Sequence, residues 1–481
     1  MGKPPNILLL MADQLRADHL GWSPRSRMAT PHFDRIAEGT AFTRCVTANP
    51  ICSPARSALL TGRYTHQIGM LAMSGDLSRE IPTYPQALQR AGYTTAGIGK
   101  FHWLQTWPWG TPRGQGVDLV AHEAEIKEYG FDHIWEASGK QLSVQNYCHY
   151  CRHLEQKGLL EDFRDHVLSR GKNNNEAKHV EFSGEPWPLP EEDYPDIVIT
   201  DQLLDWLDRQ DGEEPFFLFG SWLSPHQPHD PPRRYLDQIP YEEVDDFVHG
   251  EDQEPMDETT KKRMWKLRRS YKAMVRLLDD QMGRIFAKLE ERGLLDNTVI
   301  LFVSDHGEML GDHGRFQKSI HWHQSTVVPC AIRHPENLMG RKVTTPVDLT
   351  DLTATILDLA GLDPRQALAK DWPRFNNVIP GNSLLPCVRG EADRIRDYAF
   401  SECQGEWSMI HSDRFSYVRY HDGAPDEKRE LLFDLQADPD ERHNLATDPA
   451  FSDQLTWHRA RLFHILETTP PCQTRWAKYG D

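Results

Sequence analysis

The feature of this sequence that most constrains its fold is a series of short apolar runs separated by helical patterns. The runs are NILLLMA from Asn6, TTAGIG from Thr94, FFLFGSWL from Phe216 and NTVILFVS from Asn297. The segments between them have the periodicity and start signals of helices, and a long charged helix is expected over Thr259–Arg292. This alternation predicts an α/β fold, in which helices sandwich a large, mainly parallel sheet.

Polar side chains directly follow each run. In chain order they are Asp13 and Gln14, then Lys100 and His102, then His226, and finally Asp305 and His306. Open parallel sheets bind ligands outside the carboxyl ends of their strands. One such residue alone is explained as a helix cap or a surface histidine. Four strand ends in succession favour a functional site.

The candidate site residues fall into two chemical groups. Oxygen and imidazole donors suited to a divalent cation are Asp13, Gln14, Asp305 and His306. Donors suited to a tetrahedral anion are Arg56, Lys100, His102, His226 and Lys318. A cation beside an anion pocket indicates a hydrolase for sulfate or phosphate esters.

The stretch NPICSPARSALLTG predicts a helix whose start carries a cysteine. Ser53 suits the N-cap, Pro54 the first helical position, and Gly62 the residue where the helix stops. Cys52 then lies where unpaired N–H groups and the macrodipole favour negative charge, with Arg56 about one turn away. The alternative is a buried, inert cysteine, which is the more common case for an isolated residue.

Composition limits the classes of protein. The 481 residues predict two domains or more, and a net charge of -18 argues against broad contact with nucleic acid or an anionic membrane. No apolar run reaches the length of a membrane span, and the first run ends at Asp13, so a strand is expected there in place of a secretory signal. The 8 cysteines are dispersed, which favours a cytoplasmic location. Cys148 and Cys151 form a single C-x-x-C, a weak indication of zinc or redox chemistry.

Several motifs together resemble the sulfatase family, whose fold is similar to that of alkaline phosphatase. CSPAR at Cys52 matches the C-x-P-x-R signature, and GYTTAGIGKFH (Gly92–His102) resembles the second signature. SDHGEMLGDHGRFQK (Ser304–Lys318) matches the late metal-binding aspartate and the downstream lysine. DLTATILDLAG and LLFDLQADPDERHNL resemble segments before and within a small C-terminal domain. We expect a catalytic domain over 1–375 and an α+β domain with an antiparallel sheet over 376–481, near bacterial cytoplasmic sulfatases and phosphonate monoester hydrolases.

The resemblance implies two cofactors. Cys52 is converted after synthesis to formylglycine (3-oxoalanine) by a formylglycine-generating maturation enzyme. One divalent cation is bound by Asp13, Gln14, residue 52, Asp305 and His306. Many members have a second aspartate at the position of Gln14 and an asparagine at that of His306. Calcium is expected, with manganese next because imidazole suits it better.

The resemblance also assigns roles in hydrolysis of a sulfate ester. The hydrated aldehyde is the nucleophile, and Asp305 takes its proton. Charge on the anion is held by Arg56, Lys100 and Lys318, and the leaving alcohol is protonated by His226 or Lys318. His102 deprotonates the second hydroxyl, which releases the bound oxyanion.

Alternative functions remain open at this point. Phosphonate monoesters or phosphodiesters carry the same single charge as a sulfate ester, and a chain with unmodified Cys52 would be a binding protein. The alcohol part, a small molecule or a saccharide, is not specified. Tryptophans in Phe101–Gly114 and Lys318–Ser325 either line the site or fill a core. The small domain covers the cleft or mediates formation of a homo-oligomer.

Overall fold

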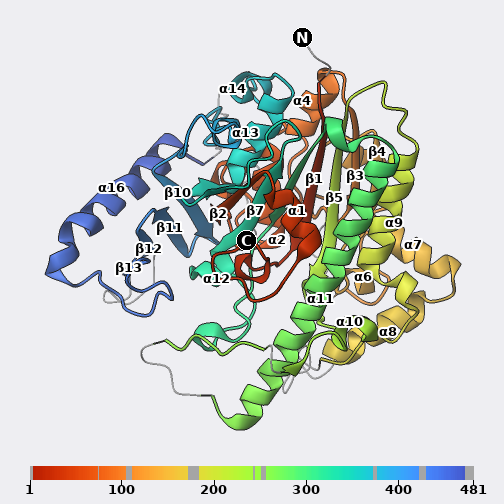
Figure 1. The fold of residues 1–481 in the computed structure, drawn as a ribbon, viewed down its shortest axis with the longest axis horizontal. Helices are drawn as coiled ribbons and strands as arrows, with labels where there is room; N and C mark the ends of the chain where they lie inside the picture. Colours follow the sequence, from red (N-terminus) through yellow and green to blue (C-terminus); the bar gives the residue numbers. More distant parts are fainter. Residues whose placement is uncertain are drawn as a thin grey trace.

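The computed structural model describes residues 4–73, 75–104, 111–171, 184–241, 244–250, 256–371, 376–421 and 429–471. Its centre is a mostly parallel sheet in the order β4-β3-β5-β1-β6-β7-β2-β8, with β9 paired to β2 (Figure 1). The strands are β1 Asn6–Asp13, β2 Thr40–Val46, β3 Thr94–Gly99, β4 His133–Glu136, β5 Phe216–Pro225, β6 Thr298–Ser304, β7 Val327–Arg333, β8 Arg341–Val343 and β9 Val347–Asp348.

The four strands predicted from the apolar runs are direct neighbours. β3, β5, β1 and β6 pair in parallel, so their carboxyl ends meet at one edge of the sheet. Every residue of β1 is buried, as expected for a parallel strand covered on both faces. The predicted fold class is confirmed. β7 differs from the parallel pattern, because it runs antiparallel to both β6 and β2.

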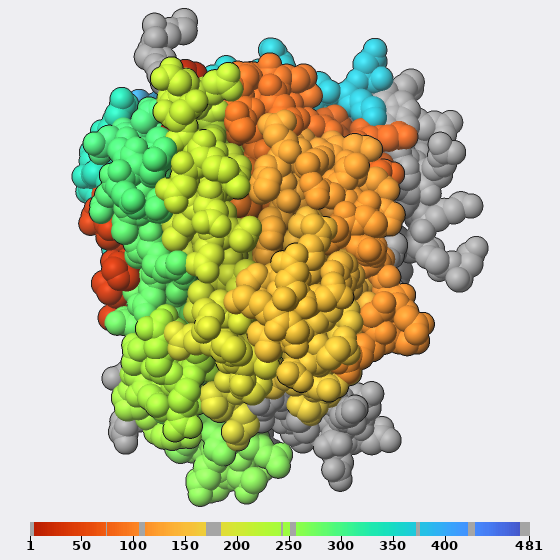
Figure 2. All heavy atoms as spheres, turned by 90° about the vertical axis from the view of Figure 1, so that its right-hand side faces the viewer, coloured from red at the N-terminus to blue at the C-terminus, as the bar shows by residue number. Residues whose placement is uncertain are grey.

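Helices cover both faces of this sheet. On one face lie α1 Pro31–Ala37, α9 Pro195–Asp208 and α11 Glu258–Glu291, and on the other α2 Cys52–Thr61, α4 Tyr84–Arg90 and α13 Leu349–Leu359. Beside α9, the segment from β4 to α8 covers one side of the molecule, coloured orange to yellow in Figure 2. The shorter helices are α3 Thr65–Ile68, α5 Glu123–Lys127, α6 Leu142–Gln145, α7 His149–Gln156, α8 Leu160–Gly171, α10 Arg233–Leu236, α12 His323–Thr326, α14 Pro364–Ala367 and α15 Leu385–Val388.

A small antiparallel sheet follows near the C-terminus. Its strands, in order, are β10 Tyr398–Cys403, β11 Trp407–Ser412, β12 Phe415–Tyr420 and β13 Glu430–Asp434, and α16 Ser452–Thr468 packs against them (Figure 1). The apolar cluster beneath this sheet also includes Ala48, Ala58 and Tyr64. The predicted antiparallel sheet is confirmed. The domain boundary at 375/376 stays a prediction, and 372–375 lie outside the described residues.

The helix that carries Cys52 begins earlier than the sequence predicts. Its first residue is Cys52 and its N-cap is Ile51, whose carbonyl accepts the N–H of Ala55 at 2.9 Å. Ser53 is therefore inside the first turn and does not cap the helix. The predicted end is correct, because Gly62 adopts φ +65° as the C-cap.

Gly99 determines how the chain leaves β3 toward Lys100. Its φ is +114°, and a Cβ at this position would lie 1.9 Å from the carbonyl oxygen of Ser221 on β5. The N–H of Lys100 donates to that same carbonyl at 2.9 Å. Only glycine fits this close approach, which directs Lys100 away from the sheet edge.

Among the described residues, none of the helices combines the length and the apolar character needed to cross a membrane.

Gly99→Ala is expected to lower the free energy of unfolding by more than about 3 kcal/mol or to prevent folding, because a methyl group collides with backbone. Gly92→Ala is the matched control. It also has positive φ (+88°), but nothing lies within 4 Å of its Cβ position, so it should cost only about 1 kcal/mol. Chemical denaturation compares the two, and equal small losses would contradict this account of the β3 end.

Candidate active site

A cavity of about 530 Å³ opens at the carboxyl edge of the central sheet. Its wall contains six residues predicted from the sequence, namely Asp13, Cys52, Lys100, His102, His226 and Lys318. The other four, Gln14, Arg56, Asp305 and His306, are buried next to it. The structure therefore brings the whole predicted set to one place.

Cys52 lies between cationic and anionic side chains. It is 1% exposed, and its Sγ is 3.1 Å from Nε2 of His306 and 3.4 Å from Nζ of Lys318. Oδ1 of Asp13 is 3.7 Å away and Nζ of Lys100 is 3.8 Å away. Burial and Asp13 raise the pKa of the thiol, but the two lysines and His306 outweigh them and hold it below its ordinary value.

Four potential metal ligands converge at the bottom of the site. One atom each of Asp13, Cys52, Asp305 and His306 lies within 4.8 Å of the others. Nδ1 of His306 donates to the carbonyl of Gly307 at 3.0 Å, which directs Nε2 at this group. Two carboxylates and an imidazole suit a divalent cation. The residues present thus fit the ion that the resemblance implies.

Arg56 lies behind the cavity wall, and not in contact with the anion space where it was expected. Its Nε donates to Oδ2 of Asp305 at 2.8 Å. Nη1 donates to the carbonyl of Lys100 at 2.6 Å and to Oγ of Ser221 at 2.8 Å. Nη2 is 4.0 Å from Oδ2 of Asp13. The guanidinium therefore fixes the Asp305 carboxylate and connects it to β3 and β5.

Positive charge dominates the rest of the wall. Nζ of Lys100 forms an ion pair with Oδ2 of Asp13. Burial alone would raise the pKa of Asp13, but Lys100, Arg56 and Lys318 hold it well below its ordinary value. The carboxylate is thus ionised and ready to bind a cation.

Lys318 is held by a constrained loop. The residues on either side of it, Gln317 and Ser319, have φ of +65° and +71°, a conformation that costs energy in residues other than glycine. Nζ of Lys318 donates to Oε1 of Gln14 at 2.6 Å. The N–H of Gln317 donates to Oε1 of Glu308 at 2.5 Å, which fixes the loop to the metal-binding strand end.

The two cavity histidines are held as defined tautomers. Nε2 of His102 donates to the carbonyl of Ser138 at 2.8 Å, which leaves Nδ1 unprotonated and, among the described residues, without a partner. Nδ1 of His226 donates to the carbonyl of Gln227 at 2.8 Å. Burial lowers the pKa of both rings, and Lys100 lowers that of His102 further, as Lys318 does for His226. Both rings are therefore neutral near pH 7.

Glu308 was not among the predicted site residues, although it lies within the motif Ser304–Lys318. Its carboxyl is buried and bonds to Nε2 of Gln14 and to the N–H of Leu310 at 3.1 Å. Burial raises its pKa. Gln14 itself has φ +68°, and its N–H donates to Oδ1 of Asp305 at 2.9 Å. The amide of Gln14 thus links Glu308 to Lys318, and its role as a metal ligand stays a prediction.

The cavity rim was not predicted either, because it comes from distant segments. Its residues are Ile51, Met73, Gln141, Leu142, Leu223 and Gln404. Gln404 is on the β10–β11 turn with φ +51°, and its N–H donates to the carbonyl of Leu71 at 3.2 Å. The β10–β11 turn of the small C-terminal sheet therefore contributes one residue, Gln404, to the cavity lining.

The predicted aromatic segments have a mostly structural role where they are described. Trp103 is 2% exposed and stacks on Phe101 with ring centroids 4.9 Å apart. Trp322 stacks on His313 at 4.3 Å. Both contacts lie away from the cavity wall. The tryptophans of 105–110 lie outside the described residues.

Cys148 and Cys151 are buried, with their Sγ atoms 3.5 Å apart. Within the described part of the chain, no further cysteine, histidine or carboxylate joins them in a metal-binding group. A zinc site at this pair is not supported by the geometry.

Comparison with known proteins agrees with this geometry. The Sulfatase family profile matches residues 5–362, and the profile "N-sulphoglucosamine sulphohydrolase, C-terminal" matches 311–465. An arylsulfatase of Clostridium perfringens is 29% identical over 96% of this chain and 94% of that protein. A choline-sulfatase of Rhizobium meliloti is 27% identical over 92% and 83%. The crystal structure of phosphonate monoester hydrolase of Agrobacterium radiobacter superposes with a TM-score of 0.76 at 24% identity, covering 97% and 96%.

The chain therefore belongs to the sulfatase family. The predicted family, its alkaline-phosphatase-like fold and its class of activity, hydrolysis of sulfate esters, are confirmed.

Arg56→Lys is expected to lower kcat about 10- to 100-fold with little change in KM. Lysine keeps the positive charge but cannot make the several hydrogen bonds of the guanidinium to Asp305, the carbonyl of Lys100 and Ser221. Each hydrogen bond to a charged group contributes about 1.5–3 kcal/mol. Steady-state kinetics on an aryl sulfate gives both constants. Ser221→Ala, which removes one of those bonds, should show a smaller loss in the same direction. A change confined to KM in both variants would instead place Arg56 on the substrate.

Proposed function

We propose that this protein hydrolyses a sulfate ester with a formylglycine nucleophile derived from Cys52 and one divalent cation, calcium with manganese as second choice. The observation that carries the proposal is the position of Cys52, at the start of α2 between metal-binding carboxylates and two lysines in one cavity. A mature residue 52 and its cation supply a hydroxyl nucleophile at neutral pH. Asp13, Asp305 and His306 would hold the cation, with Gln14 adjacent.

The side chains around residue 52 bind the anion and move protons. Lys100 and Lys318 reach within 3.8 Å and 3.4 Å of Sγ, so both can hold sulfate oxygens there. Asp305 accepts the proton of the attacking hydroxyl. Nδ1 of His102 is unprotonated and buried, so it would accept a proton from mature residue 52 when sulfate leaves. Lys318 supplies the proton for the leaving alcohol. The other predicted donor, His226, is neutral and carries its one ring proton on Nδ1, which is bonded to the carbonyl of Gln227, so it has no proton to donate.

The cavity favours a neutral alcohol part. Beyond the lysines and histidines its described wall combines apolar side chains with uncharged polar groups, the amides of Gln141, Gln227, Gln317 and Gln404 and the hydroxyls of Ser138 and Ser319. Asp13 is the one carboxylate among those described lining residues, and it is paired with Lys100. A cationic alcohol would find no counter-charge there. A saccharide or small uncharged sulfate ester fits better.

Two other functions are less well supported. Phosphonate monoester hydrolysis uses the same charges, and one solved structure of similar fold is such an enzyme. A protein that only binds sulfated ligands would not need unprotonated His102 beside residue 52. The cytoplasmic location, the maturation enzyme as partner and a homo-oligomer stay predictions.

The metal assignment predicts about one bound cation per chain. Elemental analysis of protein purified without chelator should find calcium or manganese, and the double variant Asp305→Asn, His306→Ala should lose it because two donors are removed. Glu258→Gln, an exposed carboxylate at the start of α11, is the control that keeps it. Full metal content in the double variant would refute the site.

Lys318→Ala is expected to lower the rate on an aryl sulfate and on an aryl phosphonate monoester together, by roughly 10²–10³, because one donor to the same oxygens is lost. The wild-type ratio of kcat/KM for the two substrates identifies the native ester, and we expect sulfate to lead. Lys288→Ala, a lysine on the surface of α11 paired with Asp208, should leave both rates unchanged. Preference for the phosphonate in the wild type would favour the alternative.

A further inference from the structure

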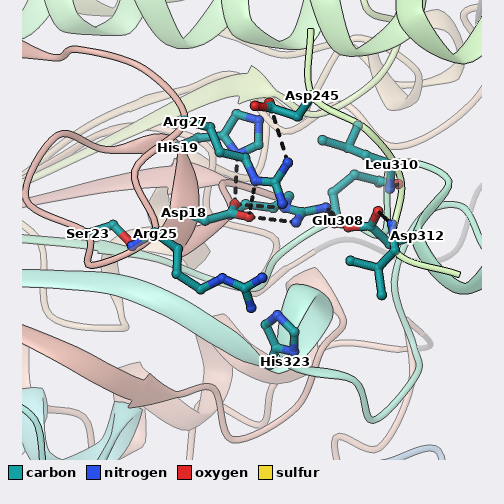
Figure 3. A network of polar contacts seen from close by, with 12 residues as sticks. Asp18, His19, Ser23, Arg25, Arg27, Asp245, Glu308, Leu310, Asp312 and His323 are labelled. Atoms are coloured by element: carbon teal, nitrogen blue, oxygen red, sulfur yellow. Dashed lines mark hydrogen bonds and ion pairs between the residues drawn. The ribbon is translucent and has the colours of Figure 1, made fainter. Parts of the chain in front are cut away.

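A second hollow, of about 260 Å³, lies near the strand ends but apart from the active-site cavity. Its lining includes Arg16, Asp18, Arg25, Arg44, His323 and Gln324, together with the hydroxyls of Ser23, Thr43 and Thr344. The two cavities share no lining residue. Figure 3 shows the side chains of Arg25 and His323 extending toward each other below Asp18.

The charge of this hollow is positive. Asp18, its one acidic residue, is bonded to Arg16 at 2.7 Å, to Arg27 at 2.8 Å and to His19 at 2.8 Å. Its negative charge is therefore fully balanced, as the dashed contacts in Figure 3 show. Arg16 also forms an ion pair with Asp312, in which Nη1 lies 2.8 Å from Oδ2.

Arg44 adds a cation that lacks a carboxylate partner. Its Nη1 donates to the backbone carbonyl of Asp413. Burial lowers the pKa of Arg44, and the carboxylate of Asp413 partly offsets that effect. Among the described residues no ion pair within 4.0 Å joins the Arg44 guanidinium to a carboxylate, so its remaining N–H groups can bind an anion.

Gln324 adds an unsatisfied amide. The residue is 2% exposed, and neither its Nε2 nor its Oε1 has a partner among the described residues. An unpaired buried polar group of this kind carries a desolvation cost. Nε2 of Gln324 therefore needs a hydrogen-bond acceptor, and its Oε1 needs a hydroxyl or amine that donates to it.

His323 adds an imidazole ring that is fixed on one side. Its Nδ1 bonds to Oε2 of Glu441 at 2.9 Å. Figure 3 shows the ring beside the guanidinium of Arg25, which itself pairs with Asp440 at 2.7 Å. The hollow thus offers cationic donors together with the acceptor Oε1 of Gln324.

We propose that this hollow is a second binding site, for a small anion that carries both oxygen acceptors and a hydroxyl, the chemistry of inorganic hydrogen phosphate. Arg44 and Nε2 of Gln324 donate to its oxygens, and its hydroxyl donates to Oε1 of Gln324. Sulfate has the charge but no hydroxyl at neutral pH, so it satisfies the donors and leaves Oε1 of Gln324 unpaired.

The site is connected to the metal-binding loop by backbone hydrogen bonds. The carbonyl of Gln324 accepts the N–H of Glu308 at 2.9 Å. A Cβ on Gly307 would lie 2.0 Å from that carbonyl, so the two segments are in close contact. Arg16 donates to the carbonyl of Met309 at 3.2 Å. An anion held here contacts residues that support the loop directly after His306.

Isothermal titration of the full chain with inorganic phosphate near pH 7 tests the proposal. The wild type should show two classes of binding, one at the active site and one here. Arg44→Gln and Gln324→Leu should each weaken one class by about 10- to 100-fold, the loss expected for a charge-assisted or buried hydrogen bond. Titration with sulfate should show only the active-site class. Gln324→Leu should also fold normally, because it removes an unpaired amide.

Arg35→Gln is the matched control, since Arg35 is a half-buried arginine on α1 outside both cavities, and it should keep both classes. The titration measures binding alone, so a loss of enzyme activity in a variant does not affect the result. A single class in the wild type, or two classes that persist in both pocket variants, would overturn the proposal.

Discussion

The active site depends on buried opposite charges at the carboxyl edge of the central sheet. Asp13 pairs with Lys100, and Asp305 pairs with Arg56, each with almost no exposure to solvent. Buried ion pairs contribute little net stability, but removal of one partner costs about 3–5 kcal/mol because the other charge is left uncompensated. The pairs thus fix the ends of β1, β3 and β6 relative to one another and place Cys52 between them.

Strained backbone supports the same arrangement. Gln14, His102, Gln317 and Ser319 all have positive φ and all lie at the cavity or directly beside it. Such conformations cost on the order of 1–3 kcal/mol each and persist only where surrounding contacts determine them. Here they lie at the ends of β1 and β3 and on either side of Lys318, where the chain changes direction next to the cavity. The buried sheet stabilises the fold. Part of that stability offsets the strained backbone at the strand ends, which positions the site residues.

Local patterns in the sequence were sufficient to predict the parallel strands and the polar groups that follow them. The antiparallel direction of β7 was not predictable, because strand direction depends on the route of the preceding loop. Ser53 was a reasonable N-cap by residue type, but the helix starts at Cys52. The place of Arg56 behind Asp305, and of Gln404 at the rim, results from contacts between segments far apart in the chain, which periodicity does not report.

The central claim is that Cys52 is the precursor of the nucleophile, and peptide mass spectrometry tests it most directly. Protein made with a formylglycine-generating enzyme should yield a peptide over Cys52–Arg56 in which sulfur is replaced by the aldehyde oxygen. Across preparations, the measured kcat on an aryl sulfate should rise in proportion to the fraction of modified peptide. Cys52→Ala should show neither the modification nor the activity. An enzyme that is fully active while this peptide keeps its thiol would contradict the account.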